Sequence, residues 1–121
     1  MTADILIVED DYSIQQLYKK LLLLFDFNVV GIAGNGNEAV SMYKSFSKKP
    51  DIILMDYRMP IKNGIEATKE ILNINNMAKI IFMSADKTIK EEALSLGVAG
   101  FKEKPIKIKK LIDIINEVLS R

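Results

Sequence analysis

Five short apolar runs, each followed by a segment with helical periodicity, constrain the fold of this chain most strongly. Strands are predicted at residues 5–8, 29–33, 51–55, 79–84 and 99–102, and helices at 12–25, 37–47, 65–72, 88–96 and 107–119. Apolar strands that alternate with helices are typical of a parallel sheet with helices on both faces. We therefore predict an α/β fold, a doubly wound three-layer sandwich of five βα units, that fills residues 1–121 as one domain.

The composition excludes several kinds of chemistry. The chain has no cysteine and no histidine, which removes disulfides, thiolate and imidazole metal sites, Ser–His triads and histidine general bases. Lys+Arg (17) and Asp+Glu (16) nearly balance, so we expect no direct binding of nucleic acid. The longest apolar run, 21–25, is too short for membrane insertion, and Met1 is not followed by the basic region of a signal peptide. We expect a cytoplasmic protein whose chemistry uses carboxylates, hydroxyls and lysines.

Polar side chains stand at the carboxyl ends of the predicted strands. Glu9 and Asp10 follow the first strand, Asp56 follows the third, Ser84 ends the fourth and Lys104 follows the fifth. Doubly wound sheets bind ligands at this edge, where the strand order reverses. If the first and third strands are neighbours there, three carboxylates meet in one crevice, and their mutual repulsion requires a cation. Ligands that are all oxygens favour Mg²⁺.

This combination of groups is suited to accepting a phosphoryl group. An ionised Asp56 can attack phosphorus as a nucleophile without a general base. Mg²⁺ and the Lys104 ammonium can neutralise charge on the phosphoryl oxygens, and the Ser84 hydroxyl lies on the same side of the crevice as Lys104.

Four motifs occur in order along the chain. They are Leu6-Ile7-Val8-Glu9-Asp10-Asp11, Leu54-Met55-Asp56-Tyr57-Arg58-Met59-Pro60 with Gly64, Met83-Ser84-Ala85, and Phe101-Lys102-Glu103-Lys104-Pro105. With these motifs at its strand ends, the chain resembles the receiver domain of two-component response regulators over essentially its whole length. The resemblance implies a flavodoxin-like sheet with strand order 2-1-3-4-5 and a cis peptide bond between Lys104 and Pro105.

The resemblance also implies roles for individual residues. Asp56 would be the phosphoacceptor, and Ser84 and Lys104 would contact the phosphoryl group. The ligands of Mg²⁺ would be Glu9 (mainly through a bound water), Asp10, Asp56 and the backbone carbonyl of Arg58.

A switch and a rate-tuning pair are implied as well. Ser84 and Phe101 would move on phosphorylation and change the surface of the fourth helix, fifth strand and fifth helix. The family more often has threonine and tyrosine at these two places, so the contrast between the on and off states stays open. Arg58 and Asp86 stand two residues after Asp56 and Ser84, and we hypothesise that they form an ion pair across the crevice mouth that slows the loss of phosphate.

The implied function is that of a signalling domain and not of an enzyme, with slow self-dephosphorylation as its only activity. A histidine kinase or phosphotransfer protein would donate the phosphoryl group, and a downstream protein would read the switched surface. A homodimer that forms on phosphorylation stays open. The chain ends with the fifth predicted helix, so we expect no output domain here. It would be a stand-alone receiver or a fragment of a longer regulator, such as a DNA-binding one.

The first predicted helix carries more leucine than one buried stripe needs. Its apolar residues at helical spacing are Ile14, Leu17, Leu21, Leu24 and Phe25. Burial is the default expectation for the crowded leucines. Exposure of Leu22 or Leu23 would instead suggest a docking surface for the kinase or phosphotransfer helix.

Two alternative functions compete with this one. The segment Gly34-Asn35-Gly36-Asn37-Glu38-Ala39 imitates a dinucleotide-binding fingerprint, with Asp56 twenty residues beyond Gly36. A dinucleotide fold needs six strands, and the acids after the first strand would repel pyrophosphate, so a glycine turn into the second helix is favoured. An aspartate-nucleophile phosphatase needs an acid two residues after the nucleophile, where this chain has Arg58.

Overall fold

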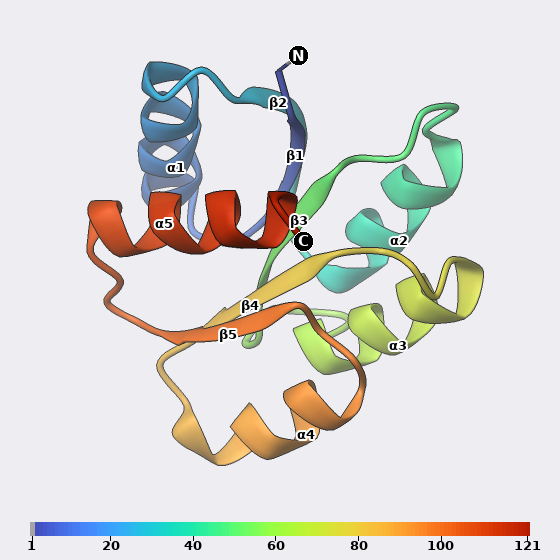
Figure 1. The fold of residues 1–121 in the computed structure, drawn as a ribbon. Helices are drawn as coiled ribbons and strands as arrows, with labels where there is room; N and C mark the ends of the chain where they lie inside the picture. The colour runs from blue at the N-terminus through green and yellow to red at the C-terminus, as the bar shows by residue number, and fades with distance from the viewer. Residues whose placement is uncertain (1) are drawn as a thin grey trace.

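The computed structural model describes residues 2–121 and contains one parallel sheet of five strands (Figure 1). The strands are β1 (Asp4–Val8), β2 (Asn28–Ala33), β3 (Ile52–Asp56), β4 (Ile80–Ser84) and β5 (Gly100–Glu103). Their order is β2-β1-β3-β4-β5, which confirms the flavodoxin-like topology. The order therefore reverses at β1 and β3, whose carboxyl ends lie side by side.

Five helices cover the two faces of the sheet. They are α1 (Tyr12–Leu24), α2 (Gly36–Ser45), α3 (Gly64–Ile74), α4 (Lys90–Ser95) and α5 (Ile108–Leu119), and a 3₁₀ turn, η1 (Lys87–Ile89), precedes α4. Figure 1 shows α1 and α5 on one face and α2, α3 and α4 on the other. Each predicted element is present, and its ends lie within two residues of the prediction. None of the helices in residues 2–121 is long and apolar enough to cross a membrane.

The strands of the sheet are apolar at nearly every position because both faces are buried. Successive side chains of a strand point to opposite faces. On β1, Leu6 and Val8 join the cluster under α2, α3 and α4, whereas Ile5 and Ile7 join the cluster under α1 and α5. This double burial fixes β1 at the centre of the molecule and holds its carboxyl end in place.

The helix α1 turns a different face to the sheet from the one that its leucine spacing favoured. Tyr18 and Leu22 are its buried residues. The large apolar or aromatic residues that remain exposed on α1 and just after it are Tyr12, Leu17, Leu23, Leu24 and Phe25. The sequence left open whether Leu22 or Leu23 is exposed. In the structure Leu22 is buried and Leu23 is exposed.

Polar contacts connect the start of α1 to the segment that follows β1. The Asp11 side chain accepts a hydrogen bond from the N–H of Ile14 at 3.1 Å and caps the helix. The Gln15 side-chain amide donates to the backbone carbonyl of Glu9 at 2.6 Å. Because α1 is apolar around much of its circumference, periodicity alone could not identify the buried side.

Candidate functional site

The carboxyl ends of β1 and β3 bring three carboxylates together. Glu9 and Asp10 directly follow β1, and Asp56 is the last residue of the adjacent β3. One carboxylate oxygen from each residue lies within 4.8 Å of the other two. Glu9 and Asp56 are buried (2% and 8% exposed), whereas Asp10 is exposed. The three acids that the sequence placed at strand ends therefore share one crevice.

Lys104 reaches this cluster from the loop after β5. Its Nζ lies 2.6 Å from Glu9 Oε1 and 3.2 Å from Asp56 Oδ1. Its backbone N–H donates to the carbonyl of Ser84 at 3.0 Å, and the Lys104–Pro105 peptide bond is cis, as the resemblance implied. A single ammonium thus bridges acids from two different strands.

Burial and charge act against each other on these groups. Burial raises the pKa of Asp56, and Lys104 and the N–H of Tyr57 offset part of that rise. Partial burial and the neighbouring Glu9 carboxylate raise the pKa of Asp10. Burial acts to lower the pKa of Lys104, but its hydrogen bond to Glu9 and the charge of Asp56 outweigh this effect and raise it. The crevice therefore favours positive charge.

The donor set of the cluster suits a hard cation. Mg²⁺ prefers carboxylate and water oxygens, so three carboxylate oxygens within 4.8 Å of one another could hold such an ion. Arg58, whose carbonyl was the fourth expected ligand, lines the cleft beside these acids. This cleft, of about 390 Å³, is lined by Asp10, Tyr57, Arg58, Met59 and Asn63.

Ser84 stands beside the acidic cluster at the end of β4. The register pairs Asp56 with Met83, so Ser84 is the next residue along the neighbouring strand. Ser84 is buried, and its Oγ accepts a hydrogen bond from the N–H of Asp86 at 2.9 Å. The hydroxyl proton remains available to donate, as a contact with a phosphoryl oxygen would require.

Arg58 and Asp86 form an ion pair between the two loops that follow β3 and β4. Arg58 Nη2 lies 2.9 Å from Asp86 Oδ2, and the guanidinium lies over the Tyr57 ring, 5.8 Å from its centroid. Hydrogen bonds from the hydroxyl and N–H of Thr88, together with Arg58, lower the pKa of Asp86. The hypothesised pair is thus present, and its effect on phosphate loss stays a prediction.

Phe101 lies half-buried on β5, away from the acids. It pairs in register with Phe82, and the two rings stack with their centroids 6.0 Å apart and an angle of 10° between their planes. Phe82 belongs to the core cluster under α2, α3 and α4. The Phe101 ring is therefore in contact with the core, and its role in switching stays a prediction.

Sequence reasoning missed Tyr18, which approaches the site from α1. A mainly apolar groove of about 380 Å³ lies between α1 and the β5–α5 loop. Its lining residues are Ile14, Leu17, Tyr18, Ala85, Lys104, Pro105 and Ile106. Burial raises the pKa of the Tyr18 hydroxyl, and the charge of Lys104 acts in the opposite direction. No signal in the sequence distinguished this tyrosine from an ordinary core aromatic.

The glycine segment that imitated a dinucleotide fingerprint has a packing role. The N–H of Gly36 donates to the carbonyl of Lys62 at 2.9 Å, and a Cβ at Gly36 would lie 2.4 Å from that oxygen. Asn35 caps α2 through a bond from the N–H of Glu38. The Gly36 amide is thus occupied by a neighbouring loop, which favours the interpretation as a turn.

Comparison with known proteins agrees with this arrangement. A family model described as response regulator receiver domain matches residues 5–116. The chain is 39% identical to the chemotaxis protein CheY of Thermotoga maritima, over 98% of both chains. It is 37% identical to CheY of Bacillus subtilis, over 99% of this chain and 100% of that protein. A solved CheX-CheY-BeF3-Mg²⁺ complex from Borrelia burgdorferi superimposes with a TM-score of 0.93 at 26% identity, covering 98% of this chain and 90% of that chain.

The matched residues run from β1 into α5 and include the acids, the serine and the lysine that converge at the carboxyl edge of the sheet. Fold, family model and sequence identity therefore lead to one conclusion: the chain belongs to the response regulator receiver domain family and is CheY-like.

Proposed function

We propose that this chain is a phosphoryl acceptor of two-component signalling. Asp56 would receive a phosphoryl group from the phosphohistidine of a histidine kinase or phosphotransfer protein, in a Mg²⁺-dependent reaction in the cytoplasm. The observation that carries the proposal is the buried Asp56 carboxylate, clustered with Glu9 and Asp10 and 3.2 Å from the ammonium of Lys104. The chain then signals through its surface to a downstream protein.

Transfer of the phosphoryl group to Asp56 needs no general base. A carboxylate oxygen of Asp56 attacks phosphorus, the P–N bond to the donor imidazole breaks, and its electron pair stays on nitrogen, which takes up a proton. Lys104 neutralises charge on the phosphoryl oxygens, and Ser84 donates a hydrogen bond to one of them. Mg²⁺ supplies further charge neutralisation when it is held by Glu9, Asp10, Asp56 and the Arg58 carbonyl.

The same site is poorly equipped for turnover. The residue two places after Asp56 is Arg58, which cannot act as the general acid that an aspartate-nucleophile phosphatase uses. The Arg58–Asp86 pair spans the two loops beside the cleft, where water must approach phosphorus. We therefore expect slow self-dephosphorylation and no other enzymatic activity.

Signalling would follow from a shift between two conformations. A phosphoryl group on Asp56 binds better to a state in which Ser84 has moved toward it, and so it biases a pre-existing equilibrium. Phe101, half-buried against Phe82, would change its position with that shift and alter the surface of α4, β5 and α5.

Removing the metal tests this proposal directly. Incubation with acetyl phosphate and Mg²⁺ should add one phosphoryl group to the chain, measured as intact mass. Chelation of Mg²⁺ should reduce the modified fraction at least about tenfold, because three carboxylates would then repel an incoming phosphate. Absence of any addition, or equal addition with and without the metal, would contradict the proposal.

Breaking the ion pair beside the cleft should shorten the life of the phosphorylated form. For Arg58→Ala we expect the half-life of phospho-Asp56 to fall only roughly threefold, because an exposed ion pair of this kind is weak. Phosphate release after removal of the donor measures it. Lys87→Ala, which breaks the more open 3.7 Å pair with Glu103, is the control. An unchanged half-life in Arg58→Ala, or an equal fall in the control, would show that the pair does not shield phosphorus.

A further inference from the structure

The loop between β3 and α3 contains a strained residue whose side chain folding does not use. Ile61 has a φ of +70°, and the N–H of Lys62 donates to the carbonyl of Pro60 at 2.7 Å. These features describe a γ-turn with positive φ at its centre, a conformation that is rare and strained, and unfavourable for a β-branched residue. Ile61 is also 81% exposed, the highest value for a large apolar side chain in residues 2–121.

Polar contacts hold the residues that follow Ile61 in place. The backbone carbonyl of Lys62 accepts a hydrogen bond from the N–H of Gly36, and the Lys62 ammonium forms an ion pair with Glu70. Asn63 forms a capping box at the start of α3. Glycine or asparagine would fit the turn better than isoleucine. Because the Ile61 side chain is exposed to water, it also contributes no hydrophobic stabilisation to the fold. Residues kept in such conformations are concentrated at functional sites.

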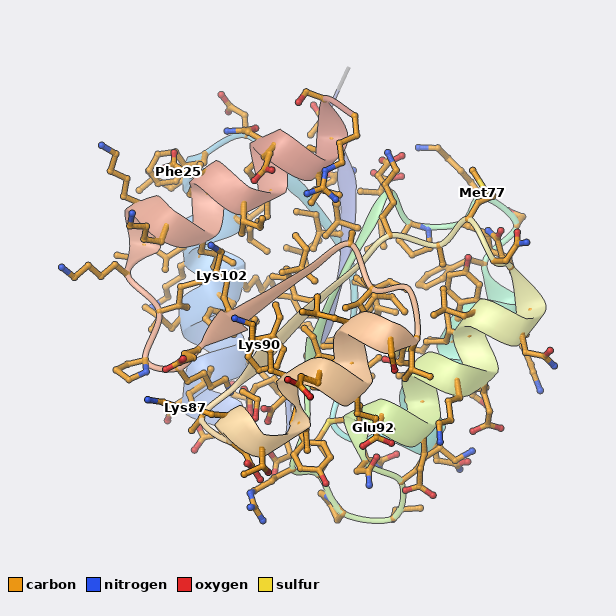
Figure 2. All side chains as sticks on the ribbon, turned by 60° about the horizontal axis from the view of Figure 1, so that its bottom comes forward. Phe25, Met77, Lys87, Lys90, Glu92 and Lys102 are labelled. Atoms are coloured by element: carbon orange, nitrogen blue, oxygen red, sulfur yellow. The ribbon has the colours of Figure 1, made fainter. Side chains whose placement is uncertain are left out.

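The position of Ile61 identifies what it would contact. Its loop begins at Tyr57, directly after Asp56, and contributes Tyr57, Arg58, Met59 and Asn63 to the wall of the acidic cleft. Figure 2 shows this pale green loop projecting from the lower edge of the molecule. Tyr12, also largely exposed, begins α1 two residues after Asp10, at the same edge of the sheet. Exposed apolar side chains therefore occur in two segments that adjoin the acids, the start of α1 and the β3–α3 loop, and the phosphoacceptor itself is buried.

We propose that Ile61 is an apolar anchor for the protein that donates the phosphoryl group, an inference that rests on the proposed function. A donor that carries phosphate on a side chain must cover the rim of the cleft to reach Asp56, which is 8% exposed. Covering the rim removes the exposed isoleucine from water, and this favours the complex. Acetyl phosphate enters the cleft without covering the rim and so gains nothing from Ile61.

The test compares Ile61→Asn with wild type for two donors. One is acetyl phosphate, and the other is the autophosphorylated histidine kinase or phosphotransfer domain that transfers fastest to the wild-type chain in a purified panel. We expect the ratio of the protein-donor rate to the acetyl phosphate rate to fall about tenfold. The variant should also unfold at a higher urea concentration, because asparagine tolerates positive φ. Met77→Asn, which alters a comparably exposed (77%) side chain before β4 at the opposite edge of the sheet, is the control and should keep the wild-type ratio.

Each other outcome overturns the inference. An unchanged ratio in Ile61→Asn would mean that the residue is only strained, and an equal loss with both donors would mean that it shapes the cleft itself. A wild-type chain that acetyl phosphate labels but no protein donor does would also contradict it. The proposed function fails separately, if acetyl phosphate does not label the wild-type chain.

Discussion

Asp56→Asn should eliminate phosphorylation of the chain by acetyl phosphate and by protein donors alike. The amide that replaces the carboxylate is neutral and a very poor nucleophile, so no phosphoryl bond can form at this position. The fold should persist, because an asparagine oxygen can still accept from the N–H of Tyr57 at 2.9 Å, and Lys104 retains its 2.6 Å contact with Glu9. Intact mass after incubation with Mg²⁺ and the donor gives the result.

A second acid provides the matched control for this substitution. Asp113 lies exposed on α5, outside the crevice, and Asp113→Asn makes the same change of charge. It should leave the modified fraction at the wild-type level. Phosphorylation that persists in Asp56→Asn, or that disappears equally in Asp113→Asn, would place the acceptor elsewhere.

Gly64→Ala should destabilise the fold strongly, by about 3 kcal/mol in the free energy of unfolding. A Cβ at this residue would lie 1.9 Å from the backbone oxygen of Asp56 and 3.1 Å from Cζ of Phe82. Gly64 also donates its N–H to the carbonyl of Tyr57 at 2.9 Å. The backbone of Gly64 or of Asp56 must therefore shift, and such a shift disturbs the phosphoacceptor. Urea unfolding followed by circular dichroism measures the loss.

Gly97→Ala separates crowding from backbone strain. Gly97 ends α4 with a φ of +97°, and nothing lies within 4 Å of the position of its Cβ. Alanine there should cost about 1 kcal/mol, from the conformation alone. Should both variants lose the same stability, or Gly64→Ala lose less, the close approach of Gly64 to Asp56 would not be a packing constraint.

The sequence pattern was sufficient for the sheet and for the positions of the acids. β1 and β3 are apolar at every position except one end, and only a strand that is buried on both faces requires such a sequence. Parallel strands place their carboxyl ends at the same edge of the sheet. The meeting of Glu9, Asp10 and Asp56 follows once β1 and β3 are neighbours. That adjacency itself came from the resemblance, since periodicity does not give the order of strands.

Features that depend on three-dimensional packing were not predictable. On α1 the buried residues are Tyr18 and Leu22, whereas Leu17 and Leu24 are exposed, so the leucine spacing pointed to the wrong side. The positive φ of Ile61 belongs to a folded loop whose ends are joined by the hydrogen bond from the Gly64 N–H to the Tyr57 carbonyl. In the same way, the hydrogen bond between Asp86 and Ser84 depends on how the loop after β4 folds, which no residue pattern encodes.

Locating the phosphoryl group within the chain tests the central claim most directly. Borohydride reduces an acyl phosphate to an alcohol, so an aspartyl phosphate becomes homoserine, which peptide mass mapping places at a single residue. We predict homoserine at position 56, only in samples treated with both the donor and Mg²⁺. Homoserine at Asp10 or Asp11, with residue 56 still an aspartate, would contradict it.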